Sequence, residues 1–229
     1  MTENLFSTSY ESLPATLPIF PLTGVLLLPG SRLPLNIFEP RYLAMISDAL
    51  GRGRLIGMVQ PITPGGFAGD GLSSSDTPPP VQKIGCAGRI ISFAETGDGR
   101  VLVSLLGLCR FAVTGEAALS PGGYRLAQVD YSRFRTDMEP SQLDLDRPRL
   151  MAALKRFFIA NNLSVDWKAL EQLDDAALIG TVSMVAPLEP LDKQALLEAS
   201  DGTTRGKVLI GLLESAPALA ANANDAPWH

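Results

Sequence analysis

The pattern of hydrophobic and polar residues changes period near the middle of the chain. Up to about residue 136, short apolar runs alternate with proline- and glycine-rich segments, which is typical of strands joined by turns. Later apolar residues recur at helical spacing, as in Leu150, Leu154, Phe157 and Phe158. This pattern predicts an α+β protein with a β-rich subdomain over residues 14–136 and a helical bundle subdomain over residues 141–215. We expect flexible tails at 1–13 and 216–229.

The β-rich half should hold about six strands and one helix. Pro18 and Pro21 lie in the first apolar run, and because proline cannot donate to a strand ladder, we expect this strand at a sheet edge. Many short strands with glycine and proline turns favour a small closed or partly open barrel. The expected strands cover residues 17–22, 25–28, 32–37 and 55–59, the two arms of a hairpin over 85–113, and 124–134.

The hairpin has a register that can be predicted from its turn. Centring the turn on residues 97–98 pairs residues whose numbers sum to 195, which sets Glu95 against Arg100 and Cys86 against Cys109. A cross-strand disulfide is therefore geometrically conceivable. We favour two buried thiols, because thiols stay reduced in the cytosol and cysteine is a common small core residue. A bulge of one residue would remove the pairing.

The segment LPLNIFEPRYLAMISDAL, Leu33 to Leu50, joins a strand to a helix. Pro40 suits the first helical position, and Glu39 would lie favourably at the positive end of the helix. Two residues apart, Glu39 and Arg41 would not face each other on a helix. We interpret the segment as a structural junction; a catalytic glutamate and a recognition surface are the alternatives. Acidic residues at 144, 146, 166, 174 and 175 similarly begin the expected later helices.

Composition excludes several kinds of chemistry. The chain has two cysteines and one histidine, His229 at its end, too few for a zinc site or for histidine-based catalysis. The net charge of −5 makes nucleic acid an unlikely partner. In the loop at 61–80, GDGLSS lacks the third glycine and the lysine of phosphate-binding loops. We therefore expect no catalytic residue, metal or cofactor.

The chain contains no apolar run of the roughly 18 residues that would span a membrane, and its N-terminus lacks the features of a secretory signal. We expect a cytoplasmic protein without a membrane partner.

Three segments resemble the N-terminal domain of Lon proteases. The clearest is LPIFPLTGVLLLPGSRLPLNIFEPRYLAMISDAL, which has the family's proline-bounded strand, its PG turn and its F-E-x-R-Y entry into a helix. IGCAGRIISFAETGDGRVLVSLLGLCRF is similar to the family's second hairpin, and DKQALLEASDGTTRGKVLIGLLE resembles it more loosely. The resemblance covers residues 17–214. It implies a barrel related to the PUA fold with one helix, followed by a helical bundle.

The resemblance implies binding and not hydrolysis. The chain has no G-x-x-x-x-G-K-[ST] motif of an ATPase and ends before a Ser–Lys protease domain could begin. We therefore expect a stand-alone, non-enzymatic module that binds unfolded or tagged polypeptides through exposed apolar groups and strand edges. A protease or a chaperone is a conceivable further partner. The candidate binding residues are Ile19, Phe20, Phe38 and Tyr42, with Arg41 at the rim.

Two other classes of function stay open on the sequence alone. One is small-molecule or nucleic-acid binding by the PUA-like barrel, which the acidic composition disfavours for RNA. The other, an enzyme of unrecognised type, is the least favoured, because histidines are missing. The oligomeric state cannot be predicted from this sequence.

Overall fold

The computed structural model describes residues 8–62, 79–140 and 143–215, and it separates into two compact units. The first unit takes in the chain up to Ser141 together with residues 180–198, and the second takes in residues 142–179 and 199–229. The predicted α+β class is confirmed. Residues 180–198 group with the strands in the first unit. The predicted bounds of the β-rich subdomain, 14–136, and of the helical bundle subdomain, 141–215, stay predictions.

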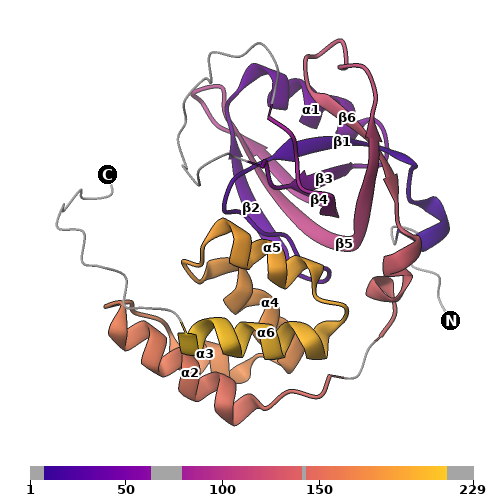
Figure 1. The fold of residues 1–229 in the computed structure, drawn as a ribbon. Helices are drawn as coiled ribbons and strands as arrows, with labels where there is room; N and C mark the ends of the chain where they lie inside the picture. The colour runs from indigo at the N-terminus through magenta and orange to yellow at the C-terminus, as the bar shows by residue number, and fades with distance from the viewer. Residues whose placement is uncertain (1–7, 63–78, 141–142, 216–229) are drawn as a thin grey trace, which may run out of the picture. The chain divides into compact units, whose positions relative to one another are not determined.

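Six strands in the described residues form one sheet with the order β2-β5-β4-β3-β1-β6 (Figure 1). The last strand, β6, also pairs with β5, so β5, β4, β3, β1 and β6 form a closed circuit and β2 lies outside it on β5. Among the strands that the structure describes, only β1 and β3 pair in parallel. The strands are β1 (Thr16–Pro21), β2 (Arg32–Ile37), β3 (Leu55–Val59), β4 (Ile84–Glu95), β5 (Val101–Glu116) and β6 (Arg125–Asp130).

Helices make up the rest of the described regular structure. The first unit holds α1, which packs beside β1 and β3, as well as α5 and the second half of α4. None of the described helices is long and apolar enough to cross a membrane. The α-helices are α1 (Pro40–Leu50), α2 (Arg147–Ala160), α3 (Trp167–Gln172), α4 (Asp175–Val185), α5 (Pro190–Glu198) and α6 (Gly202–Ser215). Two 3₁₀-helices, η1 and η2, cover Tyr10–Ser12 and Ser132–Met138.

The junction before α1 forms as the sequence predicts, apart from one interaction. Pro40 opens the helix, and Tyr42 and Met45 begin its buried side. Glu39 and Arg41 nevertheless form an exposed ion pair of 2.8 Å. The expectation that they would not face each other was wrong because Glu39 is the N-cap: its backbone is extended, so it lies outside the helical spacing.

The prediction that β1 lies at a sheet edge was wrong, because β1 pairs with both β3 and β6. Two bonds reveal how its prolines are tolerated: the Leu22 N–H donates to Val59 on β3, and Val129 on β6 donates to the Ala15 carbonyl. By alternation, Pro18 directs its nitrogen toward β3, but that pairing starts only at Ile19. Pro21 directs its nitrogen toward β6 beyond the end of their pairing. Neither proline removes a ladder bond.

Residues 25–28 are not a strand, contrary to prediction. Leu26, Leu27 and Leu28 are buried in a loop that crosses close to Gly107 of β5. The Gly30 N–H donates to the Gly107 carbonyl and the Gly107 N–H to the Ser31 carbonyl, both at 2.9 Å. The segment is therefore apolar because β5 buries it, and its backbone needs no ladder.

The predicted strand at 124–134 ends early. β6 stops at Asp130, whose carboxylate accepts bonds from the N–H and hydroxyl of Ser132 at 2.9 and 2.8 Å. This local side-chain turn starts η2, which takes in Phe134.

The predicted hairpin register holds only from Gly88 to Ile90. Bulges at 87/88 and 90/92 shift the pairs on either side by one residue, so that Cys109 lies opposite Ala87 and Glu95 opposite Val101. Both cysteines are buried and free. The direct pairing of Cys86 with Cys109 was therefore wrong, because a bulge intervenes.

Helix caps and one buried ion pair stabilise the remaining elements. The carboxylates of Asp146, Asp166 and Asp174 each accept a backbone N–H three residues later, as predicted. In the first unit, the Arg110 guanidinium binds the Asp137 carboxylate at 2.8 Å, with the two side chains 2% and 8% exposed.

The loop at 61–80 and the two tails fall largely outside the described residues. Of the loop, residues 61–62 and 79–80 are described, and Pro61 forms an isolated bridge with Val81, the residue that follows the loop. The GDGLSS segment and residues 1–7 and 216–229 lie outside the described ranges.

Candidate functional site

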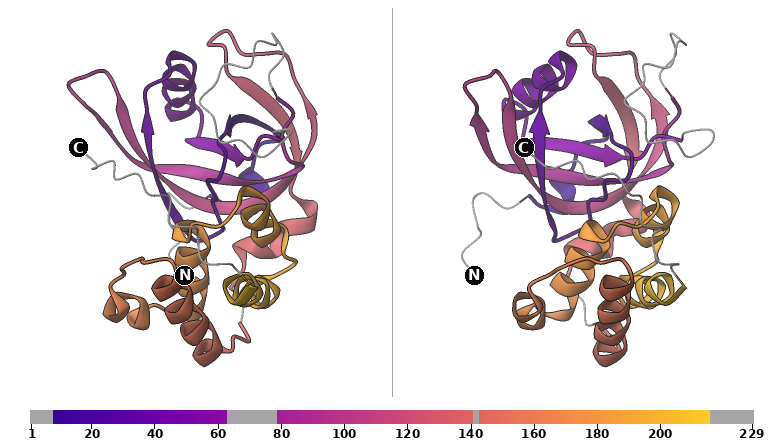
Figure 2. Two further views of the ribbon diagram at one scale, coloured as in Figure 1. Left: turned by 60° about the vertical axis from the view of Figure 1, so that its left-hand side comes forward. Right: turned by 90° about the vertical axis from the view of Figure 1, so that its left-hand side faces the viewer.

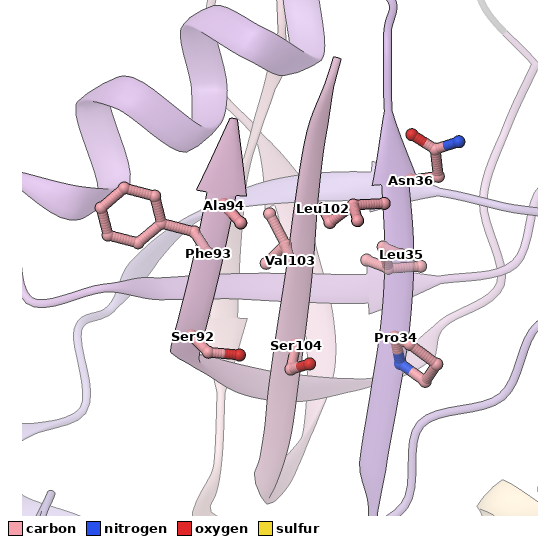
Figure 3. Close-up of a pocket in the computed structure, with 9 residues that line it drawn as sticks. All are labelled: Pro34, Leu35, Asn36, Ser92, Phe93, Ala94, Leu102, Val103 and Ser104. Atoms are coloured by element: carbon pink, nitrogen blue, oxygen red, sulfur yellow. The ribbon is translucent and has the colours of Figure 1, made fainter. Parts of the chain in front are cut away.

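Exposed apolar side chains gather where β2, β4 and β5 lie side by side. We call this surface the ledge; it contains Pro34–Asn36 of β2, Ser92–Ala94 of β4 and Leu102–Ser104 of β5, which line a shallow pocket of about 450 Å³ (Figure 3). Phe93 and Leu102 are 47% and 48% exposed. Next to the ledge, Ile91 and Phe38 are 38% and 62% exposed. Exposed residues of this size in one place are a feature of interaction surfaces.

The strand register explains why the ledge is apolar on both sides. Leu35, Val103 and Phe93 form one row across the three strands, and their side chains share the face that Ile37 and Leu105 bury. Val103 is covered, but Phe93 lies on the part of β4 that β3 does not reach, and its ring projects beyond the edge of β4 (Figure 3).

The neighbouring row has the opposite orientation. Asn36, Leu102 and Ala94 pair across the strands, so their side chains share the outer face. Phe38 continues this face two residues beyond Asn36. The Arg100 guanidinium lies 5.7 Å from the centre of the Phe38 ring and forms a 3.0 Å ion pair with Asp98.

The outer edges of the two flanking strands differ. On β4, the Thr96 N–H donates to the Arg100 carbonyl in the same register as the ladder, so alternation turns the N–H and C=O of Phe93 and Glu95 away from β5. β3 pairs with β4 only as far as Arg89, and Ile90 donates to the Arg54 carbonyl. Among the described residues, no strand pairs with the side of β4 that faces away from β5 beyond that point.

On β2 the outward positions are Arg32, Pro34 and Asn36, because Ser31 belongs to the bonded pair with Gly107. Pro34 has no N–H, and a proline at such a position is a common way to block further strand pairing. The edge of β4 has no proline. The ledge thus has one blunted edge and one open edge.

The predicted site residues divide into buried and exposed groups. Ile19, Phe20 and Tyr42 are 0%, 6% and 7% exposed. The Phe20 and Tyr42 rings are 4.2 Å apart, and the Arg41 guanidinium lies 4.6 Å from the centre of the Tyr42 ring. The structure therefore brings Phe20, Arg41 and Tyr42 together, and of the five residues only Arg41 and Phe38 lie at the surface.

Sequence reasoning missed Ile91, Phe93 and Leu102. A signal was present, because the hairpin has apolar residues at both odd and even positions close to its turn, which one buried face does not require. In both views of Figure 2 this turn projects away from β1, β3 and β6.

The electrostatics of this region favour contact over proton transfer. Burial raises the pKa of Tyr42, with Arg41 opposing the shift. Burial also raises the pKa of Tyr124, whose hydroxyl donates to Asp48 at 2.7 Å. The residues lining the pocket carry no carboxylate, imidazole or thiol. Within the described ranges, no three His, Cys, Asp or Glu side chains could hold a metal ion.

Fold and ledge together define an α+β protein in which an apolar surface adjoins an open strand edge. The sequence places it in a known group: it matches the ATP-dependent protease La (LON) substrate-binding domain over residues 16–215, and the chain belongs to that family. The expected resemblance is confirmed.

Curated relatives are whole Lon proteases. The chain is 28% identical to the Lon protease of Flavobacterium johnsoniae over 194 residues, which is 82% of this chain and 22% of the relative. It is 28% identical to Lon protease 2 of Sorangium cellulosum (86% of this chain, 24% of the relative) and 27% identical to the Escherichia coli K12 Lon protease (87% and 24%). The chain thus spans about a quarter of the length of these relatives.

Solved structures share the fold. A Lon N-terminal domain protein from Xanthomonas campestris superposes with a TM-score of 0.57 at 24% identity, covering 86% of this chain and 97% of that one. The N-terminal domain of Mycobacterium avium complex Lon protease has the same TM-score at 20% identity, covering 87% and 98%.

Proposed function

We propose that this protein binds unfolded or tagged polypeptides, without hydrolysing them, through the exposed apolar groups and the open strand edge of the ledge. The observation that carries the proposal is the grouping of Phe38, Ile91, Phe93 and Leu102, each more than a third exposed, over three adjoining strands. Membership of a substrate-binding domain family supports a role in substrate recognition.

The five residues expected from the sequence have two roles in this proposal. Phe38 and Arg41 would contact the polypeptide directly, because both lie at the surface. Phe20 and Tyr42 would hold the start of α1 against β1 through their ring contact, and Ile19 would support β1 from the core, since all three are buried. A PUA-like barrel is the scaffold that we propose, and the closed circuit of five strands supports it.

The test is a titration of the chain with a fluorescein-labelled polypeptide that has been reduced and alkylated so that it cannot fold. We expect saturable binding by fluorescence anisotropy. Replacing both Phe38 and Leu102 with serine should weaken binding about tenfold, because two exposed apolar contacts are lost while the core is left intact.

The matched control is Ile159→Ser, which removes an exposed apolar side chain in the second unit (80% exposed). This variant should bind like the unmodified protein. The proposal fails if the folded chain shows no saturable binding, or if Ile159→Ser weakens binding as much as the double substitution.

A further inference from the structure

The open edge of β4 is short and has a direction. It offers the outward-facing backbone groups of Phe93 and Glu95, enough for about four hydrogen bonds with one extended segment. At one end of this edge the chain turns through Arg54, whose carbonyl accepts from Ile90, and enters β3 at Leu55. A strand added here would therefore continue the line of β3.

Opposite charges lie at the two ends of the edge. Arg52 and Arg54 are exposed in the turn before β3, and Glu95 is exposed at the other end. Within the described residues none of the three is in an ion pair. Arg54 has a left-handed backbone (φ 63°), which the tight turn before β3 imposes.

These charges select one orientation of an added strand. Since β3 runs antiparallel to β4, a segment that also runs antiparallel to β4 has its C-terminal end at the Arg52–Arg54 turn and its N-terminal end at Glu95. An acidic group at the C-terminal end and a basic group at the N-terminal end would then complement both charges. The same segment added in parallel would place each of its charges beside a like charge. A segment of reversed sequence meets both charges only when it is added in parallel, and parallel pairing is the less stable kind.

We propose that the edge of β4 from Ile91 to Glu95 captures an extended polypeptide segment by antiparallel strand addition, with a carboxylate at the segment's C-terminal end read by Arg54 and Arg52. This inference rests on the proposed function and names the class of segment that the ledge takes. The carboxylate is either an acidic side chain or a free C-terminus, which share the same chemistry.

The ledge also determines which kinds of side chain the captured segment should carry. The residue opposite Phe93 shares the face of the projecting ring and should be apolar. The residue opposite Ala94 lies on the outer face, where the small alanine leaves Leu102 within reach, so it too should be apolar. The carboxylate belongs about three residues after the position opposite Phe93, given the rise of a strand. The amidated peptide KLVTVE meets these requirements: its lysine lies opposite Glu95, its second valine lies opposite Ile91, and its glutamate follows beyond the paired edge, where the segment turns away from the backbone of Arg54.

Peptide direction is the first test and needs no variant. Labelled KLVTVE amide should bind the full chain saturably, and the reversed peptide EVTVLK amide, of identical composition, should bind about tenfold more weakly. A third peptide, KLVTV with a free C-terminus, separates the two sources of carboxylate: binding equal to that of KLVTVE assigns a free C-terminus as sufficient. Equal binding of the forward and reversed peptides would overturn the proposal.

Substitutions test the backbone and the charge separately. Glu95→Pro removes an outward N–H together with the carboxylate, without removing a bond to β5, so a folded variant should lose most of its affinity for KLVTVE. Glu95→Gln removes the charge alone and should lose much less. The control for Glu95→Pro is Arg32→Pro, which removes an outward N–H from the edge of β2 outside the ledge and should leave the affinity for KLVTVE unchanged. Arg54→Asn keeps a residue that tolerates the left-handed backbone, and it should weaken KLVTVE about threefold while leaving KLVTVQ unaffected.

The outcomes separate this inference from the proposed function. If the unfolded polypeptide binds the unmodified protein and the Glu95→Pro variant equally, the proposed function stands and strand addition at β4 is refuted. If the unmodified protein binds no unfolded polypeptide, the proposed function itself fails. Sedimentation that shows a dimer abolished by Glu95→Pro would assign the edge to a second copy of the chain and likewise refute peptide capture.

Discussion

Removing the carboxylate of Asp137 should destabilise the first unit severely. This carboxylate accepts from the Arg110 Nε and Nη2 at 2.8 Å each and from the Arg110 backbone N–H at 2.9 Å. Arg110 is 1% exposed, its ring partner Phe134 lies 4.6 Å away, and its Nη1 donates to the Leu197 carbonyl at 3.0 Å. Asp137→Ala therefore removes a carboxylate that is paired with a buried guanidinium charge.

The expected cost of Asp137→Ala is about 3–5 kcal/mol, because breaking a buried pair exposes the full desolvation penalty of the surviving charge. Folded domains are stable by only about 5–15 kcal/mol, so this one substitution should remove a large part of the total. Arg110→Met combined with Asp137→Leu should cost much less, about 1–2 kcal/mol, because no charge is left and only hydrogen bonds to backbone groups are lost.

Urea unfolding followed by far-UV circular dichroism measures these differences, provided that the dependence on urea concentration is unchanged among the variants. The double-mutant cycle should give a coupling free energy of about 2 kcal/mol or more between the two side chains. A cost below about 1 kcal/mol for Asp137→Ala, or a double substitution as costly as the sum of the single ones, would refute the argument that the charge pair is coupled through burial.

Three further predictions use the same unfolding assay. Gly107→Ala should cost about 3 kcal/mol, since a Cβ would collide with the Leu28 carbonyl; a cost near zero would show that the loop moves freely. Burial raises the pKa of Cys109 to about 12. As the pH rises above about 8.5, only the thiol of the unfolded chain ionises, so the free energy of unfolding should fall by up to about 1.4 kcal/mol per pH unit. Cys109→Ala should reduce this slope. Asp201→Ala should cost about 1 kcal/mol, because the Asp201 carboxylate caps α6 by accepting from the Thr204 N–H at 2.7 Å. Hydrogen bonding, led by Ser200, lowers the pKa of Asp201 to about 2. In the unmodified protein this contribution to stability should therefore be lost as the pH falls from about 4 through 2.

Features encoded by neighbouring residues could be predicted from the sequence. Pro40 begins α1, and the capping aspartates begin α2, α3 and α4, because a cap needs only a side chain and an N–H three residues away. The same holds for the buried side of α1, which follows from spacing alone. These predictions involve no partner distant in the sequence.

Features that depend on distant partners could not be predicted in the same way. The place of β1 inside the sheet depends on which half of the strand meets β3 and which meets β6. The burial of residues 26–28 depends on a glycine in β5 some 80 residues away along the chain. The bulge that separates Cys86 from Cys109 arises in a strand that is paired on both sides, where a two-strand register is an incomplete description.

The candidate site shows the same division. Tyr42 is conspicuous in the sequence because it ends the FEPRY motif, and Phe20 because it lies in the proline-bounded first strand, yet the two rings are buried against each other. Phe93 is exposed because the pairing of β3 with β4 ends at Arg89 and leaves the rest of β4 with β5 as its one neighbour among the described strands, which no local pattern encodes.

The prolines of β1 and β2 have different effects. Inside the sheet Pro18 removes no ladder bond because its nitrogen faces a gap in pairing, whereas on β2 Pro34 blocks further pairing at an edge. What a proline or an apolar residue does in this fold therefore depends on which neighbour its backbone faces, and the open edge of β4 is the place where that neighbour can be another polypeptide.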